Sequence, residues 1–104
     1  MSEQFVYITT TGRKTGLPRQ IEIWFVEIEG RLYILAEHGL TTKWVQNLIA
    51  NPNVTVRLGD RQYRGVARVL DEVKDSEACS RVQAAAREKY GWGEGLPVEI
   101  TPAD

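Results

Sequence analysis

The segment Arg19–Ala36 reads RQIEIWFVEIEGRLYILA and consists of two apolar runs separated by Glu29-Gly30. A two-residue link between two such runs is typical of a β-hairpin. In the first run apolar residues occupy both alternating faces, which favours a central strand covered on both sides. The sequence therefore predicts an antiparallel pair of strands at Arg19–Ile28 and Arg31–Ala36.

Further strands are predicted on either side of this hairpin. They lie at Phe5–Thr10, Asn53–Leu58, Arg61–Leu70 and, as a short closing strand, Leu96–Thr101. Five or six antiparallel strands in so short a chain favour a small barrel over an open sheet, because closure removes exposed edges. The predicted fold class is mainly β (α+β), a small antiparallel barrel with two helices.

Helical spacing appears in two segments. Thr42–Ala50 places its apolar residues on one stripe, with Thr42 as the predicted N-cap and Asn51-Pro52 as the stop. Asp75–Tyr90 has a second apolar face, with Asp75 as the predicted N-cap. Cys79 lies on that apolar face, so we expect a core residue rather than a nucleophile.

Composition excludes several classes of function. The 104 residues carry 13 basic and 14 acidic side chains, which gives no electrostatic argument for nucleic acid. No apolar run approaches the roughly 20 residues of a membrane span, and the first residues lack the pattern of a signal peptide. One cysteine and one histidine cannot form a disulfide framework or a Cys/His metal cluster. We expect a single cytoplasmic domain over residues 1–104 without a metal.

The most unusual segment is Thr9–Arg19, TTTGRKTGLPR, which connects two predicted strands. Its glycines would let the backbone N–H groups approach an anion, and Arg13, Lys14 and Arg19 can pair with phosphate or carboxylate. It is not a Walker A loop, since no helix follows. A solvated hairpin turn is an equally good interpretation of the charges.

A second segment, Ala36–Trp44, leaves a strand and enters a helix. His38 could donate a hydrogen bond to a phosphate or a ring carbonyl, although a lone histidine is more often a surface residue. Glu37 beside it argues against a purely anionic ligand. Tyr90 and Trp92 could line a pocket rim, or pack a helix end onto the barrel.

Several stretches together carry a family resemblance. They are Thr9–Arg19, Trp24-Phe25-Val26, Arg31–Ala36, Lys43-Trp44 and Asn47–Val54. In this order they resemble the deazaflavin-dependent nitroreductase family over about residues 5 to 72. Its members are split β-barrels of the flavin-reductase/FMN-binding type, related to the pyridoxamine 5'-phosphate oxidase-like proteins. Glu37-His38-Gly39-Leu40 stands where the family usually has Ser-Lys-Gly-Gly.

The resemblance implies a site for 8-hydroxy-5-deazaflavin (coenzyme F-420), with FMN as the related alternative. By resemblance the cofactor contacts fall to Arg13, Lys14, Thr15, Pro18, Arg19, Ala36, Glu37, His38, Trp44 and Asn47. Candidate residues of the substrate pocket are Trp24, Tyr90 and Trp92.

The predicted activity is the hydride-type reduction of a small hydrophobic acceptor by an oxidoreductase that is nitroreductase-like. The cofactor would supply the chemistry, and no side chain is assigned as an obligatory acid or base. Two alternatives remain open: a barrel that binds a small molecule or flavin without catalysis, and a structural barrel without a ligand. A homodimer is plausible, because a barrel this small with three tryptophans could need a partner to cover apolar surface.

Overall fold

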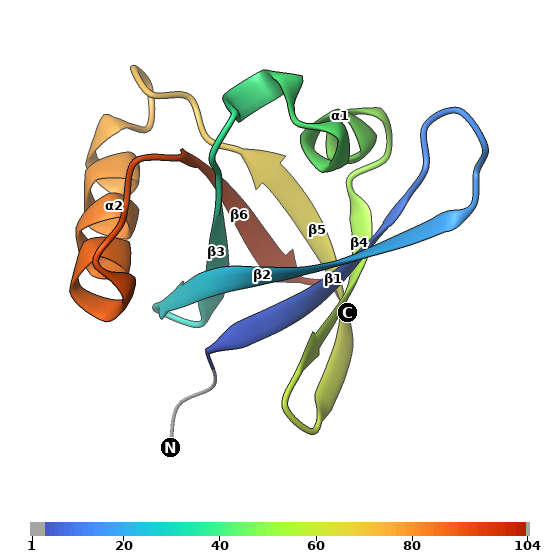
Figure 1. Ribbon diagram of the computed structural model, residues 1–104, viewed down its shortest axis with the longest axis horizontal. Coiled ribbons are helices and arrows are strands. Elements are labelled where there is room, and N and C mark those ends of the chain that lie inside the picture. The colour runs from blue at the N-terminus through green and yellow to red at the C-terminus, as the bar shows by residue number, and fades with distance from the viewer. Residues whose placement is uncertain (1–3, 104) are drawn as a thin grey trace.

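The computed structural model describes residues 4–103 and shows a closed antiparallel barrel with two α-helices (Figure 1). The strands are β1 (Phe5–Thr11), β2 (Pro18–Ile28), β3 (Arg31–Ala36), β4 (Asn53–Leu58), β5 (Arg61–Val69) and β6 (Leu96–Pro102). The helices are α1 (Lys43–Ala50), α2 (Ser76–Tyr90) and the short 3-10 helix η1 (Gly39–Thr41). Around the barrel the order is β1-β2-β3-β6-β5-β4, so the predicted fold class is confirmed.

The hairpin that the sequence indicates between β2 and β3 is present. Glu29 and Gly30 both have positive φ, 52° and 80°, which is the backbone of a tight two-residue turn that matches the twist of the strands. β3 and β4 begin and end at the predicted residues, and β2 begins one residue earlier, at Pro18. Local alternation and turn chemistry therefore placed these strands accurately.

β2 is apolar on both faces because it separates two clusters of buried side chains. Phe25 points into the barrel interior together with Val6, Ile8 and Ile34. Val26 points outward, into a second cluster formed with α2. α2 thus packs on the outside of the barrel, whereas α1 lies near one end of it and adds Leu48 to the interior cluster (Figure 1).

The two predicted helix caps occupy the correct positions but do not cap through their side chains. Asp75 instead accepts a hydrogen bond from the backbone N–H of Asp71 at 2.9 Å and pairs with Arg68 at 3.2 Å. Thr42 makes no side-chain cap, and its Oγ1 is buried without a partner. The two predicted N-cap positions are therefore confirmed, although neither side chain bonds the first turn of its helix.

The pairing between β1 and β4 is short. β1 pairs with β2 over seven residues but with β4 over three, from Tyr7 to Thr9. Beyond Thr9 the two strands separate, which opens the barrel wall at one end. Within residues 4–103, no helix has the length and apolarity needed to cross a membrane.

Candidate functional site

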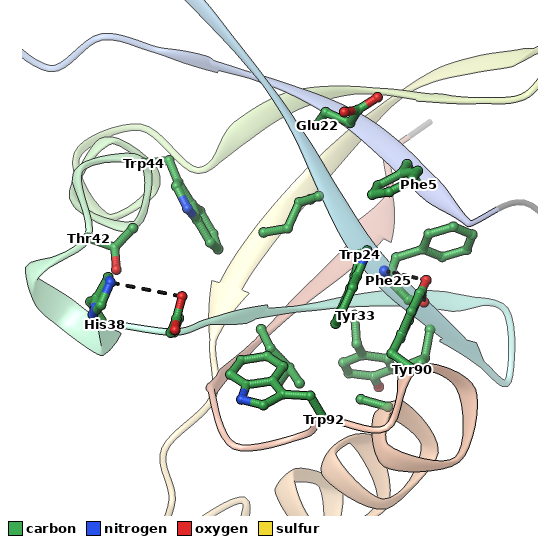
Figure 2. Close-up of a pocket in the computed structure, with 15 residues that line it drawn as sticks. Phe5, Glu22, Trp24, Phe25, Tyr33, His38, Thr42, Trp44, Tyr90 and Trp92 are labelled. Atoms are coloured by element: carbon green, nitrogen blue, oxygen red, sulfur yellow. Dashed lines mark hydrogen bonds and ion pairs between the residues drawn. The ribbon is translucent and has the colours of Figure 1, made fainter.

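A cavity of about 510 Å³ lies between the barrel, the segment that leads into α1, and the chain that follows α2 (Figure 2). Seven of its fifteen lining residues are aromatic: Phe5, Trp24, Phe25, Tyr33, Trp44, Tyr90 and Trp92. The other lining residues are Glu22, Ile23, Val26, Leu35, Glu37, His38, Thr42 and Ala86. The cavity suits a planar, largely apolar ligand with a few polar groups.

Three rings that the sequence singled out lie together in this wall (Figure 2). Trp24 stacks on Tyr90 with ring centroids 4.4 Å apart and planes 3° apart. Trp92 meets Trp24 edge-on at 6.5 Å. The structure thus brings together Trp24, Tyr90 and Trp92 because α2 ends beside β2. Trp24 and Trp92 are 68 residues apart in the sequence.

The hydroxyl of Tyr90 is committed to backbone hydrogen bonds. It accepts the N–H of Phe25 at 3.1 Å and lies within donating distance of the carbonyl oxygens of Gln4 and Phe25, at 2.7 and 2.9 Å. The β1–β2 pairing ends with Phe5 opposite Trp24. Phe25, the next residue on β2, therefore bonds to the hydroxyl of Tyr90 instead of to β1. Its ring, rather than its hydroxyl, faces the cavity.

Tyr33 is a cavity residue that the sequence reasoning missed. Its hydroxyl donates to Glu99 at 2.9 Å, and Glu99 also lies 3.5 Å from Arg68 and 3.7 Å from Arg31. Burial and the hydrogen bond to Glu99 raise the pKa of Tyr33, so the phenol stays protonated and its ring stays fixed. Tyr33 pairs with Val26 on β2, and that register is the signal that could have placed it.

The polar end of the cavity is formed by the segment between β3 and α1. Ala36 is buried at the end of β3, and Glu37 and His38 follow at the cavity with side chains 71% and 77% exposed. Nε2 of His38 is 3.9 Å from the Glu37 carboxylate, which is an ion-pair distance rather than a hydrogen bond. The unpartnered Oγ1 of Thr42 lies at this end too.

The predicted cofactor residues Trp44 and Asn47 lie three apart on α1 but have different surroundings. Trp44 lines the cavity. Asn47 is 7% exposed, and its Oδ1 accepts from the backbone N–H and from Nη1 of Arg13, at 3.2 and 3.1 Å. Its Nδ2 donates to Oγ1 of Thr10 at 3.3 Å. Asn47 therefore ties the basic loop to α1.

The basic loop between β1 and β2 uses several of its own N–H groups internally. Gly12 donates to the carbonyl oxygen of Leu17, Gly16 donates to that of Gly12, and Leu17 donates to Oγ1 of Thr15. The expectation that glycine N–H groups of this loop face an anion is therefore wrong for Gly12 and Gly16. The exposed cationic side chains of the loop remain available for that task, namely Arg13, Lys14 and Arg19.

Pro18 lies away from the aromatic cavity. It lines a second, more polar cavity of about 640 Å³ at the place where β1 and β4 separate, together with Thr10 and Arg64. Thr15 lines neither cavity and braces the loop instead. The predicted cofactor residues thus fall into a cavity group and a loop group, joined through α1, except for Ala36, which is buried and lines neither cavity.

Cys79 is a core residue, as its helical position predicts. It is 5% exposed, and burial together with the nearby carboxylates Glu72, Asp75 and Asp71 raises the pKa of its thiol. A buried thiol of raised pKa is a poor nucleophile. Among residues 4–103 no three His, Cys, Asp or Glu side chains gather into a possible metal site.

Comparison with known proteins identifies relatives of this architecture. Residues 1–100 match the family described as F420H(2)-dependent quinone reductase. An F420-H2 dependent reductase is 28% identical, with a TM-score of 0.76 over 96% of this chain and 95% of that chain. A domain-swapped dimer is 27% identical, with a TM-score of 0.66 over 96% of this chain and 81% of that chain.

More distant structures share the fold alone. A putative pyridoxamine 5'-phosphate oxidase from Listeria innocua is 19% identical, with a TM-score of 0.76 over 97% of this chain and 85% of that chain. The comparisons confirm the resemblance seen in the sequence, the split β-barrel and the assignment to the deazaflavin-dependent oxidoreductases. Of the two cofactors expected, coenzyme F-420 is the one they support.

Proposed function

This chain belongs to the F420H(2)-dependent quinone reductase family, and on that premise we propose that it reduces a quinone in the aromatic cavity. The quinone would take one hydride from the reduced deazaflavin and one proton from water, and leave as the hydroquinone. The observation that carries this proposal is one cavity with seven aromatic side chains in its lining. Residues 1–104 would act as one binding domain.

The residues of the cavity fit a deazaflavin ring and a small acceptor. Flat aromatic walls such as the stacked Trp24 and Tyr90 favour planar ligands. The polar end of the lining offers hydrogen-bonding groups to polar ring atoms. When bound, the deazaflavin supplies the hydride.

The chain's own contribution is to bind, orient and exclude water. The hydroxyl bonds of Tyr33 and Tyr90 fix two rings of the wall, so the ligand meets a surface that is already ordered. The exposed side chains of Glu37 and His38 mark the wet end of the cavity, where a proton from solvent can enter.

We place the anionic tail of the cofactor outside the cavity, on the basic loop. Asn47 holds Arg13 at the loop, while Trp44, one turn earlier on α1, lines the cavity. A cofactor that spans both would keep its ring among aromatic side chains and its charges beside Arg13, Lys14 and Arg19. Arginine suits phosphate and carboxylate because its N–H groups can donate in pairs.

Two measurements test the activity. All three tryptophans line the cavity, so oxidised coenzyme F-420 should quench the intrinsic fluorescence in a saturable manner. The reduced cofactor should then be oxidised by menadione only when the protein is present. Saturable binding without turnover of any quinone would instead identify a non-catalytic binding barrel.

Arg13→Ala and Arg19→Ala should each weaken binding of coenzyme F-420 by about 1–2 kcal/mol, because each removes a hydrogen-bonding cation. The affinity of each variant should also depend less on salt concentration. The measurement is the fluorescence titration. Lys74→Ala removes an exposed charge that lines neither cavity, and it is the matched control. Equal dissociation constants for all three variants would contradict the role of the loop.

We also propose a homodimer in the cytoplasm, with a small-molecule acceptor as the other partner. The domain-swapped dimer among the relatives supports the dimer, as do large apolar side chains at the surface such as Leu40 and Ile49, 59% and 61% exposed. The mass measured by light scattering distinguishes one copy from two.

A further inference from the structure

The charges of the aromatic cavity are one-sided. Among the described residues its lining includes the carboxylates Glu22 and Glu37 and the imidazole of His38, but no lysine or arginine. Two cations contact aromatic rings at or next to this lining. Nζ of Lys89 lies 3.8 Å from the centroid of Phe25 and donates to the Phe25 carbonyl oxygen, and Arg57 covers the ring of Tyr7 at 4.2 Å. Neither of these two cations is part of the lining.

The two carboxylates differ in how far they are already satisfied. Glu22 accepts a hydrogen bond of 2.6 Å from the hydroxyl of Tyr7, the ring that Arg57 covers. Glu37 has His38 at 3.9 Å as its ion-pair partner, beyond hydrogen-bond distance. Glu37 therefore presents the less compensated negative charge at the cavity.

We propose that Glu37, supported by Glu22, makes this cavity select acceptors by charge, so that it binds neutral and cationic quinones more tightly than anionic ones. The aromatic walls act in the same direction, since ring faces attract cations. The inference rests on the proposed function and names the class of quinone that it takes. It agrees with a cofactor tail held at the basic loop, because the anionic groups then stay away from Glu37.

The size of the effect follows from exposure. Glu37 is 71% exposed, so water screens its charge and the penalty for an anionic ligand is modest. We expect an anionic quinone to bind about three- to tenfold more weakly than a neutral one, because the repulsion between two partly screened charges is of this size. The ratio should shrink as salt is added.

The test compares three anthraquinones of equal ring size, which carry a hydroxymethyl, a sulfonate or a trimethylammonium group. Quenching of tryptophan fluorescence gives their dissociation constants, and the steady-state kcat/KM with reduced coenzyme F-420 gives the second readout. Wild type should bind the sulfonate most weakly. Glu37→Gln should reduce the ratio of the sulfonate to the hydroxymethyl dissociation constant about threefold, whereas Glu37→Lys should prefer the sulfonate.

Glu88→Gln is the matched control, since Glu88 is exposed on α2 and outside the cavity lining. The inference is overturned if Glu37→Gln behaves as Glu88→Gln does, or if wild type binds all three anthraquinones equally or none of them. Absence of turnover with an intact binding ratio would overturn the proposed function alone. Turnover of all three quinones at equal kcat/KM would overturn the charge selection but leave the proposed function standing.

Discussion

Gly93→Ala should lower the free energy of unfolding by about 2–3 kcal/mol or more, a cost typical of a forced close contact. A Cβ at this position would collide with the backbone carbonyl oxygen of Gln83 on α2, and it would lie 2.9 Å from Cγ of Arg87. The collision is with backbone, so the chain after α2 must move as a whole. Trp92 precedes Gly93 and would move with it, so the cavity should lose ligand binding as well. Urea unfolding and the anthraquinone titration measure the two effects.

Gly91→Ala is the control for this prediction. Gly91 ends α2 with φ of 80°, and a Cβ there would meet no atom within 4 Å. Only the left-handed backbone opposes the substitution, at about 1 kcal/mol. Equal losses of stability in the two variants would show that close packing of the chain on α2 contributes nothing.

Asn47→Ala should weaken binding of coenzyme F-420 by about 2–3 kcal/mol, the sum of small hydrogen-bond terms at a buried site. The substitution removes the oxygen that accepts two hydrogen bonds from Arg13 and the N–H that donates one to Thr10. One of these contacts holds the backbone of Arg13, so its loss frees Lys14 as well. Fluorescence titration gives the dissociation constant of the cofactor. Urea unfolding gives the free energy of unfolding, and so shows whether the substitution also destabilises the protein.

A double-mutant cycle with Arg13→Ala separates the contributions. Arg13→Ala keeps the backbone N–H that donates to Asn47, so it should cost less than Asn47→Ala. The double variant should bind about as weakly as Asn47→Ala, because the side chain of Arg13 depends on the same acceptor. Additive losses would mean that Asn47 acts elsewhere. Asn51→Ala, which removes a local contact with Asn53, should bind the cofactor as wild type does.

The strands were predictable because their signals are local. The Glu29-Gly30 turn, the alternation in β4 and β5, and the two apolar faces of β2 are each visible within about ten residues. The closure of the barrel was predictable only as a class, since the pairing of β1 with β4 joins residues nearly 50 positions apart. No local pattern specifies that register.

The residue types of the site were predictable from the sequence, but their arrangement in space was predictable only in part. Tryptophans, tyrosines and a basic loop stand out in the sequence, and the structure brings Trp24, Trp44 and Trp92 to one cavity. The engagement of Asn47 with Arg13 was not predictable, since it depends on how a loop meets a helix 34 residues later. The sequence did predict Thr42 as the N-cap of α1, but not that its hydroxyl would be buried without a partner.

The hydroxyl of Tyr90 has a consequence for how the working molecule is assembled during folding. It joins the end of α2 to Gln4 and Phe25, across 86 and 65 residues of chain. Contacts of such separation cost loop-closure entropy, because the intervening chain must be ordered before they can form. The aromatic wall is therefore completed only when both ends of the chain have met. Ligand binding therefore reports that the first strand and the end of α2 have both reached their places in the barrel.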